Sequence, residues 1–201
     1  MKLKNIYSKP LVLVALEVEL PAVNYPKLNI QYTGVGKVNA TYSAMKNITI
    51  FKPSIVINFG SAGALDLSVS GLVQVVKVLQ RDMDVRDLGF KLGQTPFEEE
   101  NGALILKDYF FRKNDSSLPK VSCSTGDNFV SSVPELESQI VDMELYSLAK
   151  VCSLERIPLM SWKFISDNAD VSSPDAWEKN VTRGAKVFEE LVLAKILKEM
   201  D

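Results

Sequence analysis

Aliphatic residues occur along this chain in short unbroken runs, each followed by a polar or glycine-containing turn. Such runs are typical of strands that are buried on both faces of a sheet. Elsewhere the apolar residues recur at helical spacing, most clearly at Val38, Tyr42, Met45 and Ile48. The pattern predicts strands at residues 11–15, 28–33, 55–59, 72–79, 104–106, 121–124 and 159–165, and helices at residues 38–51, 142–154 and 175–200.

This alternation of strands and helices predicts an α/β fold with three layers, in which helices cover both faces of a mixed, largely parallel central sheet. The length of 201 residues suits a single domain over residues 1–201. Residues 81–103 are rich in Gly, Pro, Asp and Glu and predict a long loop. A loop of that length in a compact domain is usually functional.

Composition narrows the range of functions. The net charge of −2 argues against nucleic-acid binding by phosphate neutralisation. No apolar run approaches the roughly 20 residues of a membrane-spanning helix, so we expect no membrane association. The two cysteines, Cys123 and Cys152, predict buried core residues in a reducing compartment, the cytoplasm. Without any histidine, a zinc site is not expected and Ser-His-Asp or Cys-His catalysis is excluded.

Acidic residues follow three separate predicted strands. Acids at the rims of strands in an α/β protein are well placed to hold a sugar and to protonate a leaving group. The recurrence of such acids, in a chain without histidine, points to carboxylate chemistry. The three clusters are Glu17 with Glu19, Asp142 with Glu144, and Asp167 with Asp170.

Each acid also has an explanation that involves no function. Glu17 fits a solvated face, whereas Glu19 lies among apolar neighbours, where a partly desolvated carboxylate could act as a general base on water. Asp142 and Glu144 would stand in the first turn of a helix, where the macrodipole favours acids. Asp167 could be a helix cap. Only the combination of the clusters favours the functional interpretation.

Two glycine-containing turns are further candidates for a binding site. Residues 34–37 (Gly-Val-Gly-Lys) follow a strand and open a helix, as an anion-binding helix N-terminus would. They lack the third glycine of a dinucleotide fingerprint and the spacing of a P-loop, so a tight turn is favoured. At residues 60–63 (Gly-Ser-Ala-Gly), close approach to a ligand and close packing of a strand end are equally good explanations.

Seven motifs, in chain order, resemble those of the nucleoside phosphorylase and nucleosidase superfamily, and most closely its 5′-methylthioadenosine/S-adenosylhomocysteine nucleosidases. Examples are Ala-Leu-Glu-Val-Glu for Ala-Met-Glu-Glu-Glu and Val-Asp-Met-Glu for Val-Glu-Met-Glu. The seven motifs lie at residues 15–19, 34–40, 57–63, 82–94, 124–129, 141–144 and 165–170.

The resemblance implies a phosphorylase/hydrolase-like fold and hydrolysis of the N-glycosidic bond of an adenosine-type nucleoside. It implies that Glu19 activates the attacking water and that Asp167, helped by Ser166, protonates N7 of the departing purine. No cofactor and no metal would be needed. Asp167 would have to carry its proton near neutral pH, which requires a desolvated position.

The resemblance also implies how the substrate is held. Glu144 would accept hydrogen bonds from the ribose hydroxyls, while Met143 packs on the sugar. Phe129 would stack on the base, and the backbone of Val130 would read the edge of the base. Ser61 would help to position the acid or the base.

Some residues depart from the family pattern. Residues 20–33 are a compressed version of a longer hairpin region that borders the site in relatives, so the pocket for the 5′-substituent could be open or remodelled. Lys163 stands where Arg is common and Arg81 where His is common. Leu16 replaces a Met, and Asp142 replaces a Glu.

Two other functions stay open. Phosphorylases of this superfamily bind phosphate through arginines, and Arg81, Arg86 and Arg112 leave that alternative unsettled. A non-catalytic nucleoside-binding protein on the same fold is the second alternative. By analogy with the superfamily we also expect a homo-oligomer, with a dimer favoured, and a role in methionine salvage.

Overall fold

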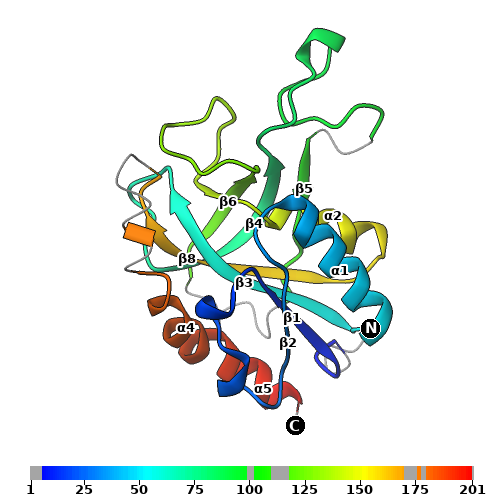
Figure 1. Cartoon of the computed structure of the whole chain (residues 1–201), viewed down its shortest axis with the longest axis vertical. Coiled ribbons are helices and arrows are strands. Elements are labelled where there is room, and N and C mark those ends of the chain that lie inside the picture. Colours follow the sequence, from blue (N-terminus) through cyan, green and yellow to red (C-terminus); the bar gives the residue numbers. More distant parts are fainter. Residues whose placement is uncertain (1–5, 99–101, 110–117, 170–175, 178–179, 201) are drawn as a thin grey trace.

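The computed structural model describes residues 6–98, 102–109, 118–169, 176–177 and 180–200. Within these ranges strands and helices alternate, as the hydrophobic pattern predicts (Figure 1). The strands are β1 (Pro10–Val14), β2 (Asn29–Tyr32), β3 (Ile55–Ala64), β4 (Leu72–Gln80), β5 (Ala103–Ile105), β6 (Lys120–Thr125), β7 (Ile140–Asp142) and β8 (Leu159–Asp167). The helices are α1 (Lys37–Phe51), α2 (Leu145–Leu154), α4 (Arg183–Phe188) and α5 (Ala194–Met200), with a π-helical turn at Glu189–Leu193 and short 3-10 turns at Glu17–Glu19, Ala22–Asn24 and Arg86–Leu88.

The sheet is mixed and largely parallel, which confirms the predicted fold class. Strand β1 pairs in parallel with β2 and β3, and β8 pairs in parallel with β3 but antiparallel with β4. Strand β6 is parallel to both β4 and β7, and β7 returns antiparallel to the end of β3. The pairing therefore closes into a ring of β3, β8, β4, β6 and β7, which the sequence pattern did not predict.

Two hydrophobic cores lie on the two faces of the sheet, as the three-layer prediction requires. Helices α1 and α2 pack on one face, where Ala44, Ile48 and Leu148 are buried against the strands. The segment from α4 to α5 covers the other face, and its Phe188 stacks on Phe59 of β3 with ring centroids 4.3 Å apart. Among the described residues, no helix is both long enough and apolar enough to cross a membrane.

Three differences from the prediction go beyond a shift of one or two residues at the end of an element. Strand β3 continues to Ala64, because glycine and small residues at 60–63 still pair with β7 and β8. Strand β7 was not predicted, and Asp142 ends this strand instead of beginning the helix. The predicted helix 175–200 is interrupted before α4, where Val181 and Thr182, two β-branched residues with low helix propensity, form a turn. The start of that predicted helix, Asp175, lies outside the described residues.

The face of helix α1 that packs against the core is not the apolar face that the spacing predicted. Its buried positions are mostly small or polar, namely Ala40, Ser43, Ala44, Asn47 and Ile48. Of the four apolar residues that gave the helical spacing, only Ile48 is buried, whereas the other three are exposed to solvent. Small residues allow α1 to lie close to the sheet, and the larger apolar residues form an exposed stripe of Val38, Tyr42 and Met45 on its outer side.

The predicted loop after β4 projects from the body of the molecule, at the top of Figure 1. Its first residue, Arg81, is buried between β4 and β6. The carboxylate of the next residue, Asp82, forms an ion pair with Lys37 of α1, with Oδ1 2.6 Å from Nζ. Arg86 pairs with Asp84 and Glu135 at the surface. Of the described part of this loop, Arg81 alone lines the pocket described below, so the functional role expected for the loop as a whole stays a prediction.

Candidate active site

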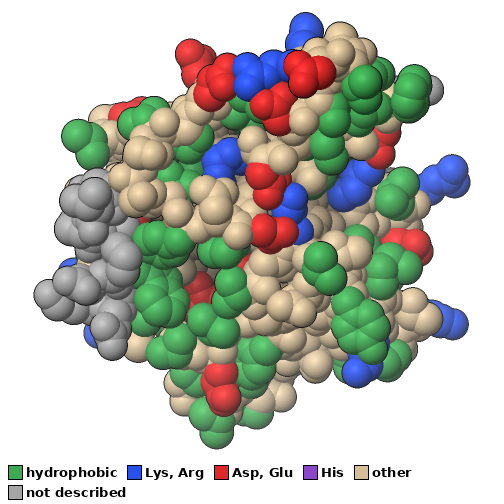
Figure 2. All heavy atoms as spheres, turned by 45° about the horizontal axis from the view of Figure 1, so that its top comes forward, with side chains coloured by type: hydrophobic (Ala, Val, Ile, Leu, Met, Phe, Trp, Pro, Cys, Tyr) green, Lys and Arg blue, Asp and Glu red, His purple; other side chains and the backbone are tan. Residues whose placement is uncertain are grey.

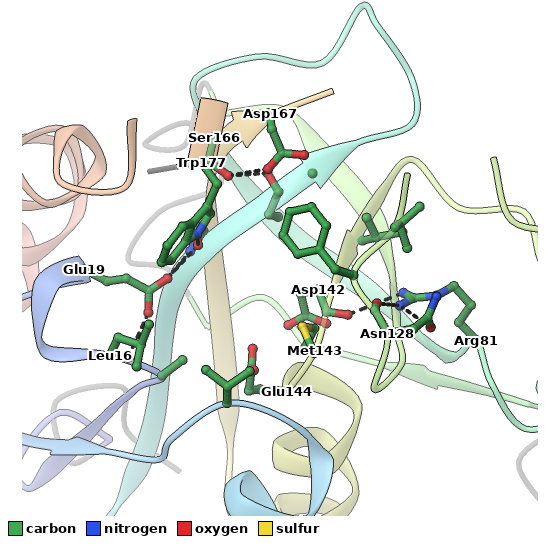
Figure 3. Close-up of a pocket in the computed structure, with 18 residues that line it drawn as sticks. Leu16, Glu19, Arg81, Asn128, Asp142, Met143, Glu144, Ser166, Asp167 and Trp177 are labelled. Carbon is green, nitrogen blue, oxygen red and sulfur yellow. Dashed lines mark hydrogen bonds between the residues drawn. The ribbon is translucent and has the colours of Figure 1, made fainter. Parts of the chain in front are cut away.

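A pocket of about 600 Å³ opens where the ends of β3, β7 and β8 meet the turns after β1 and β6 (Figure 3). Gly63 of β3 is at the centre of this junction, because it pairs with Val141 of β7 and with Asp167 of β8. Residues that are far apart in sequence are thereby brought together. All eight residues predicted for the site line this pocket: Glu19, Ser61, Phe129, Val130, Met143, Glu144, Ser166 and Asp167.

Glu19 lies in the 3-10 turn after β1 and is only 3% exposed, whereas Glu17 in the same turn faces solvent, as predicted. Its carboxylate is held by three hydrogen bonds. The backbone N–H and the hydroxyl of Ser61 both donate to Oε1 at 2.7 Å, and the N–H of Leu16 donates to Oε2 at 3.1 Å. A buried carboxylate with partners on both oxygens has a fixed orientation at the pocket wall.

Asp167 ends β8 and is 8% exposed. The N–H of Ala169 donates to its Oδ1 at 2.9 Å, and the Ser166 hydroxyl lies 2.8 Å from its Oδ2. A Cβ at position 63 would come within 2.8 Å of Oδ1, so only glycine leaves space for this carboxyl group. For residues 60–63, the close approach of the backbone therefore serves an acidic side chain of the site.

Glu144 stands between β7 and α2, and the N–H of Gly36 donates to its Oε1 at 2.9 Å. The next N–H of α1, from Lys37, donates to Asp127 at 2.7 Å. Carboxylates of the chain itself thus occupy the start of α1, which agrees with the favoured interpretation of residues 34–37 as a tight turn. Burial, together with the neighbouring Asp142 carboxylate, raises the pKa of Glu144 to about 7.

Asp142 also lines the pocket, and it forms a buried ion pair with Lys163. Nζ lies 2.7 Å from Oδ2, and the side chains of Asp142 and Lys163 are 1% and 2% exposed. Thr125 and the N–H of Leu145 also donate to this carboxylate, at 2.5 and 2.9 Å. Burial alone would raise the pKa of Asp142. The Lys163 ammonium and the hydrogen bonds from Lys163, Thr125 and Leu145 together outweigh this effect, so the pKa lies below its ordinary value. Burial would likewise lower the pKa of Lys163, but Asp142 and Glu144 raise it. Both groups are therefore charged at neutral pH.

Arg81 is buried and holds the turn after β6 in place. Its Nη1 donates to the carbonyl of Ser124 at 2.8 Å, and its Nη2 donates to the carbonyls of Gly126 and Asn128 at 3.2 and 2.8 Å. Figure 3 shows the guanidinium next to Asn128 at the edge of the pocket. An arginine can form several such bonds from one planar group, which a histidine in the same place cannot.

The two residues after this turn form an apolar wall of the pocket. Val130 is buried and packs with Val141 and Ala169, whereas Phe129 is 48% exposed and borders the opening. Met143 also lines the pocket. An aromatic ring beside a fixed backbone segment is a suitable surface for a flat heterocycle.

Two polar side chains that line the pocket, Trp177 and Asn128, were given no role by sequence reasoning. The indole Nε1–H of Trp177 donates to the Ser61 hydroxyl oxygen at 2.9 Å, so this residue is connected to Glu19. The only available signal was a tryptophan near the start of a predicted amphipathic helix, where an aromatic residue is normally part of the core. Asn128 stands inside the motif at 124–129, but its chemistry gave no reason to select it.

Comparison with known proteins shows to which family the fold that carries this pocket belongs. A sequence model of the phosphorylase superfamily matches residues 22–197. The chain belongs to this superfamily. That match confirms the predicted family, and it means that the pocket occupies a phosphorylase-superfamily fold.

Individual members of the superfamily resemble most of the chain. A 5′-methylthioadenosine/S-adenosylhomocysteine nucleosidase of Staphylococcus haemolyticus is 30% identical, across 87% of this chain and 84% of the relative. One of Buchnera aphidicola subsp. Acyrthosiphon pisum is 32% identical, across 74% and 71%. The Helicobacter pylori enzyme of the same name, in complex with butyl-thio-DADMe-Immucillin-A, superposes with a TM-score of 0.84 at 21% identity, covering 96% of this chain and 98% of that chain.

Proposed function

We propose that this protein hydrolyses the N-glycosidic bond of an adenosine-type nucleoside of the 5′-methylthioadenosine/S-adenosylhomocysteine class, releasing adenine and the sugar. The observation that carries the proposal is the convergence of three buried carboxyl groups, Glu19, Glu144 and Asp167, from three separate segments onto one pocket. The names of the similar proteins support the same activity.

In the proposed reaction a water molecule attacks C1′ of the ribose and the C1′–N9 bond breaks. The electron pair of that bond passes into the purine, which takes a proton at N7 from Asp167. Glu19 accepts the proton that the water loses, and Glu144 accepts hydrogen bonds from the ribose hydroxyls. Carboxylates near the sugar stabilise the positive charge that develops there, and the acid relieves the negative charge on the base.

The surroundings of Asp167 can accommodate its protonated form. The Ser166 hydroxyl lies 3.3 Å from the carbonyl oxygen of Ala62 and 2.8 Å from Oδ2 of Asp167. When the hydroxyl donates to the carbonyl, its oxygen is free to accept a proton held on Oδ2. When Asp167 has given its proton to the purine, the hydroxyl can turn and donate to the carboxylate. The same two contacts thus serve the acid before and after proton transfer.

The groups that the arginines already bind favour water over phosphate as the nucleophile. Nη1 and Nη2 of Arg81, the one arginine among the described residues that line the pocket, donate to backbone carbonyls. Arg86 is paired with two carboxylates on the projecting loop. Arg112 lies outside the described residues. A phosphate would meet acidic side chains in the pocket and few free donors.

The decisive experiment measures purine release from methylthioadenosine, adenosylhomocysteine, adenosine and inosine, each with and without phosphate. We expect adenine from methylthioadenosine at a rate that does not depend on phosphate. Release only with phosphate would identify a phosphorylase. Adenine binding without release from any substrate would identify a binding protein.

The raised pKa of Glu144 predicts how activity depends on pH. Glu144 loses its charge as the pH falls through about 7, and a protonated carboxyl group is a poorer acceptor for two ribose hydroxyls. We expect kcat/KM for methylthioadenosine to fall as the pH drops below about 7. The fall should be absent in Glu144→Gln, which is weaker at every pH, and present in Glu17→Gln, whose side chain is exposed. A wild-type profile that is flat between pH 6 and 8 would contradict this assignment.

We also propose that the protein forms a homo-oligomer, with a dimer favoured. The exposed stripe on α1 supports it, because Val38, Tyr42 and Met45 are 79%, 71% and 39% exposed, and Val35, which precedes the helix, is also exposed. Figure 2 shows acidic and basic side chains interspersed over one face, without a field of one sign that would repel a second copy. Tyr42→Glu should convert the dimer to a monomer in light scattering, whereas Ala194→Glu, at an exposed position of α5 on the opposite face of the sheet, should not. A monomeric wild type would refute the proposal.

The cellular setting proposed here is the cytoplasm, with a role in methionine salvage. Both cysteines are free and buried, as suits a reducing compartment. A nucleosidase of this class would remove methylthioadenosine. Cells that lack the protein should accumulate that nucleoside, and unchanged levels would argue against the role.

A further inference from the structure

Three side chains from three parts of the chain form a continuous hydrogen-bonded series at one wall of the pocket. The indole Nε1–H of Trp177 lies 2.9 Å from Oγ of Ser61, and this Oγ lies 2.7 Å from Oε1 of Glu19 (Figure 3). Trp177 follows β8, Ser61 belongs to β3, and Glu19 follows β1. The series ends on the carboxylate to which the proposed function assigns the activation of water.

The direction of the hydrogen bonds in this series is fixed by chemistry. An indole N–H can only donate, and an ionised carboxylate can only accept. A serine hydroxyl has one proton, so when its oxygen accepts from Trp177 the proton is directed to Glu19. We propose that Trp177 is a positioning residue for Glu19, acting through the Ser61 hydroxyl. The inference rests on the proposed hydrolysis and adds to it a residue outside the three carboxyl groups.

Orientation of Glu19 matters because its two oxygens are bound differently. Oε1 receives two donors from Ser61 at 2.7 Å, whereas Oε2 receives the Leu16 N–H at the longer distance of 3.1 Å. A carboxylate oxygen can accept two hydrogen bonds, so Oε2 keeps capacity for a water molecule. Without the Trp177 donor, the Ser61 hydroxyl is free to rotate, and one of the two bonds that hold Oε1 is weakened.

The alternative role of Trp177 is that of a plain apolar wall, since its ring lines the pocket. The two roles predict different kinetics. Loss of a wall alters substrate binding, and therefore KM, whether or not Ser61 is present. Loss of a positioning hydrogen bond lowers kcat, and only while Ser61 can pass the effect to Glu19.

The test compares wild type, Trp177→Phe, Ser61→Ala and the double variant in hydrolysis of methylthioadenosine. Phenylalanine keeps an aromatic ring but lacks the N–H donor. We expect Trp177→Phe to lower kcat by about three- to tenfold, the effect of one neutral hydrogen bond, with KM within about twofold of wild type. In the Ser61→Ala background the same substitution should leave kcat unchanged.

A second variant separates the N–H from the shape of the ring. Benzothienylalanine, introduced at position 177 alone, has the shape of tryptophan with sulfur in place of N–H, and it should reproduce the fall in kcat at an unchanged melting temperature. An equal fall in kcat in both Ser61 backgrounds, or a change in KM alone, would overturn the inference. A wild type without purine release would instead refute the proposed function, so the two failures are distinguishable.

Discussion

Replacing Asp167 by Asn should lower kcat for methylthioadenosine by about 10²- to 10⁴-fold, the range in which a positioned general acid contributes. Asparagine can still accept the Ala169 N–H through its oxygen, and its amide can donate to Ser166. The local structure is therefore retained while the proton for the purine is lost. Because the substitution affects the departure of the base, the change in KM should be small.

A matched control and a second substrate make this prediction specific. Asp87→Asn changes an exposed acid on the projecting loop and should leave the rate unchanged. A riboside with nitrophenolate as leaving group needs no acid, so Asp167→Asn should cleave it at nearly the wild-type rate. A variant that releases adenine almost normally from methylthioadenosine would show that Asp167 is not the acid.

The largest effect on stability is expected from Lys163→Met. The substitution leaves Asp142 buried and unpaired next to Glu144, and such a loss typically lowers the free energy of unfolding by about 3–5 kcal/mol. Urea denaturation at pH 7.5 measures the change. Lys163→Arg keeps the positive charge and should lower the free energy of unfolding much less.

The pH dependence of that variant supplies an independent check. Without Lys163, burial raises the pKa of Asp142 in the folded state above its value in the unfolded chain. The folded state then binds more protons than the unfolded state, so stability should rise as the pH falls from 7.5 towards the ordinary pKa of an aspartate. The double variant Lys163→Met with Asp142→Asn should recover part of the lost stability. Equal stability of Lys163→Met and wild type would mean that the ion pair does not hold the site together.

The sequence predicted the fold class and the members of the pocket better than it predicted how they are arranged. Continuous aliphatic runs identify buried strands because both faces of those strands meet a core. Strand β7 escaped detection because Ile140, Val141 and Asp142 are too few to form a pattern, and its pairing depends on β3 and β6 rather than on its own residues. The exposed stripe of α1 could not be recognised from spacing, which marks an apolar face without saying what covers it.

The hydrogen bonds and the ion pair of the site could not be predicted from the sequence either. The residue types at 19, 144 and 167 indicate carboxylate chemistry, but the hydrogen bond from Trp177 to Ser61 depends on a segment that folds back from more than 100 residues away. Lys163 was visible only as a departure from a family pattern. Its role as the partner of Asp142 follows from the pairing of β8 with β3 and β4, a long-range feature that local patterns do not encode.

The closed ring of strands has a consequence for how this chain tolerates changes in length. Gly63 is locked in register by β7 and by β8 at once, so neither strand can slip without breaking pairs on the other side of the ring. A one-residue insertion or deletion within 140–142 or 159–167 would move one acid of the pocket away from the others, and so separate the residues that are proposed to act together. The projecting loop at residues 84–98 carries none of these pairs and lines none of the pocket. Natural and engineered length variation should therefore accumulate there, leaving the ring itself nearly invariant in length.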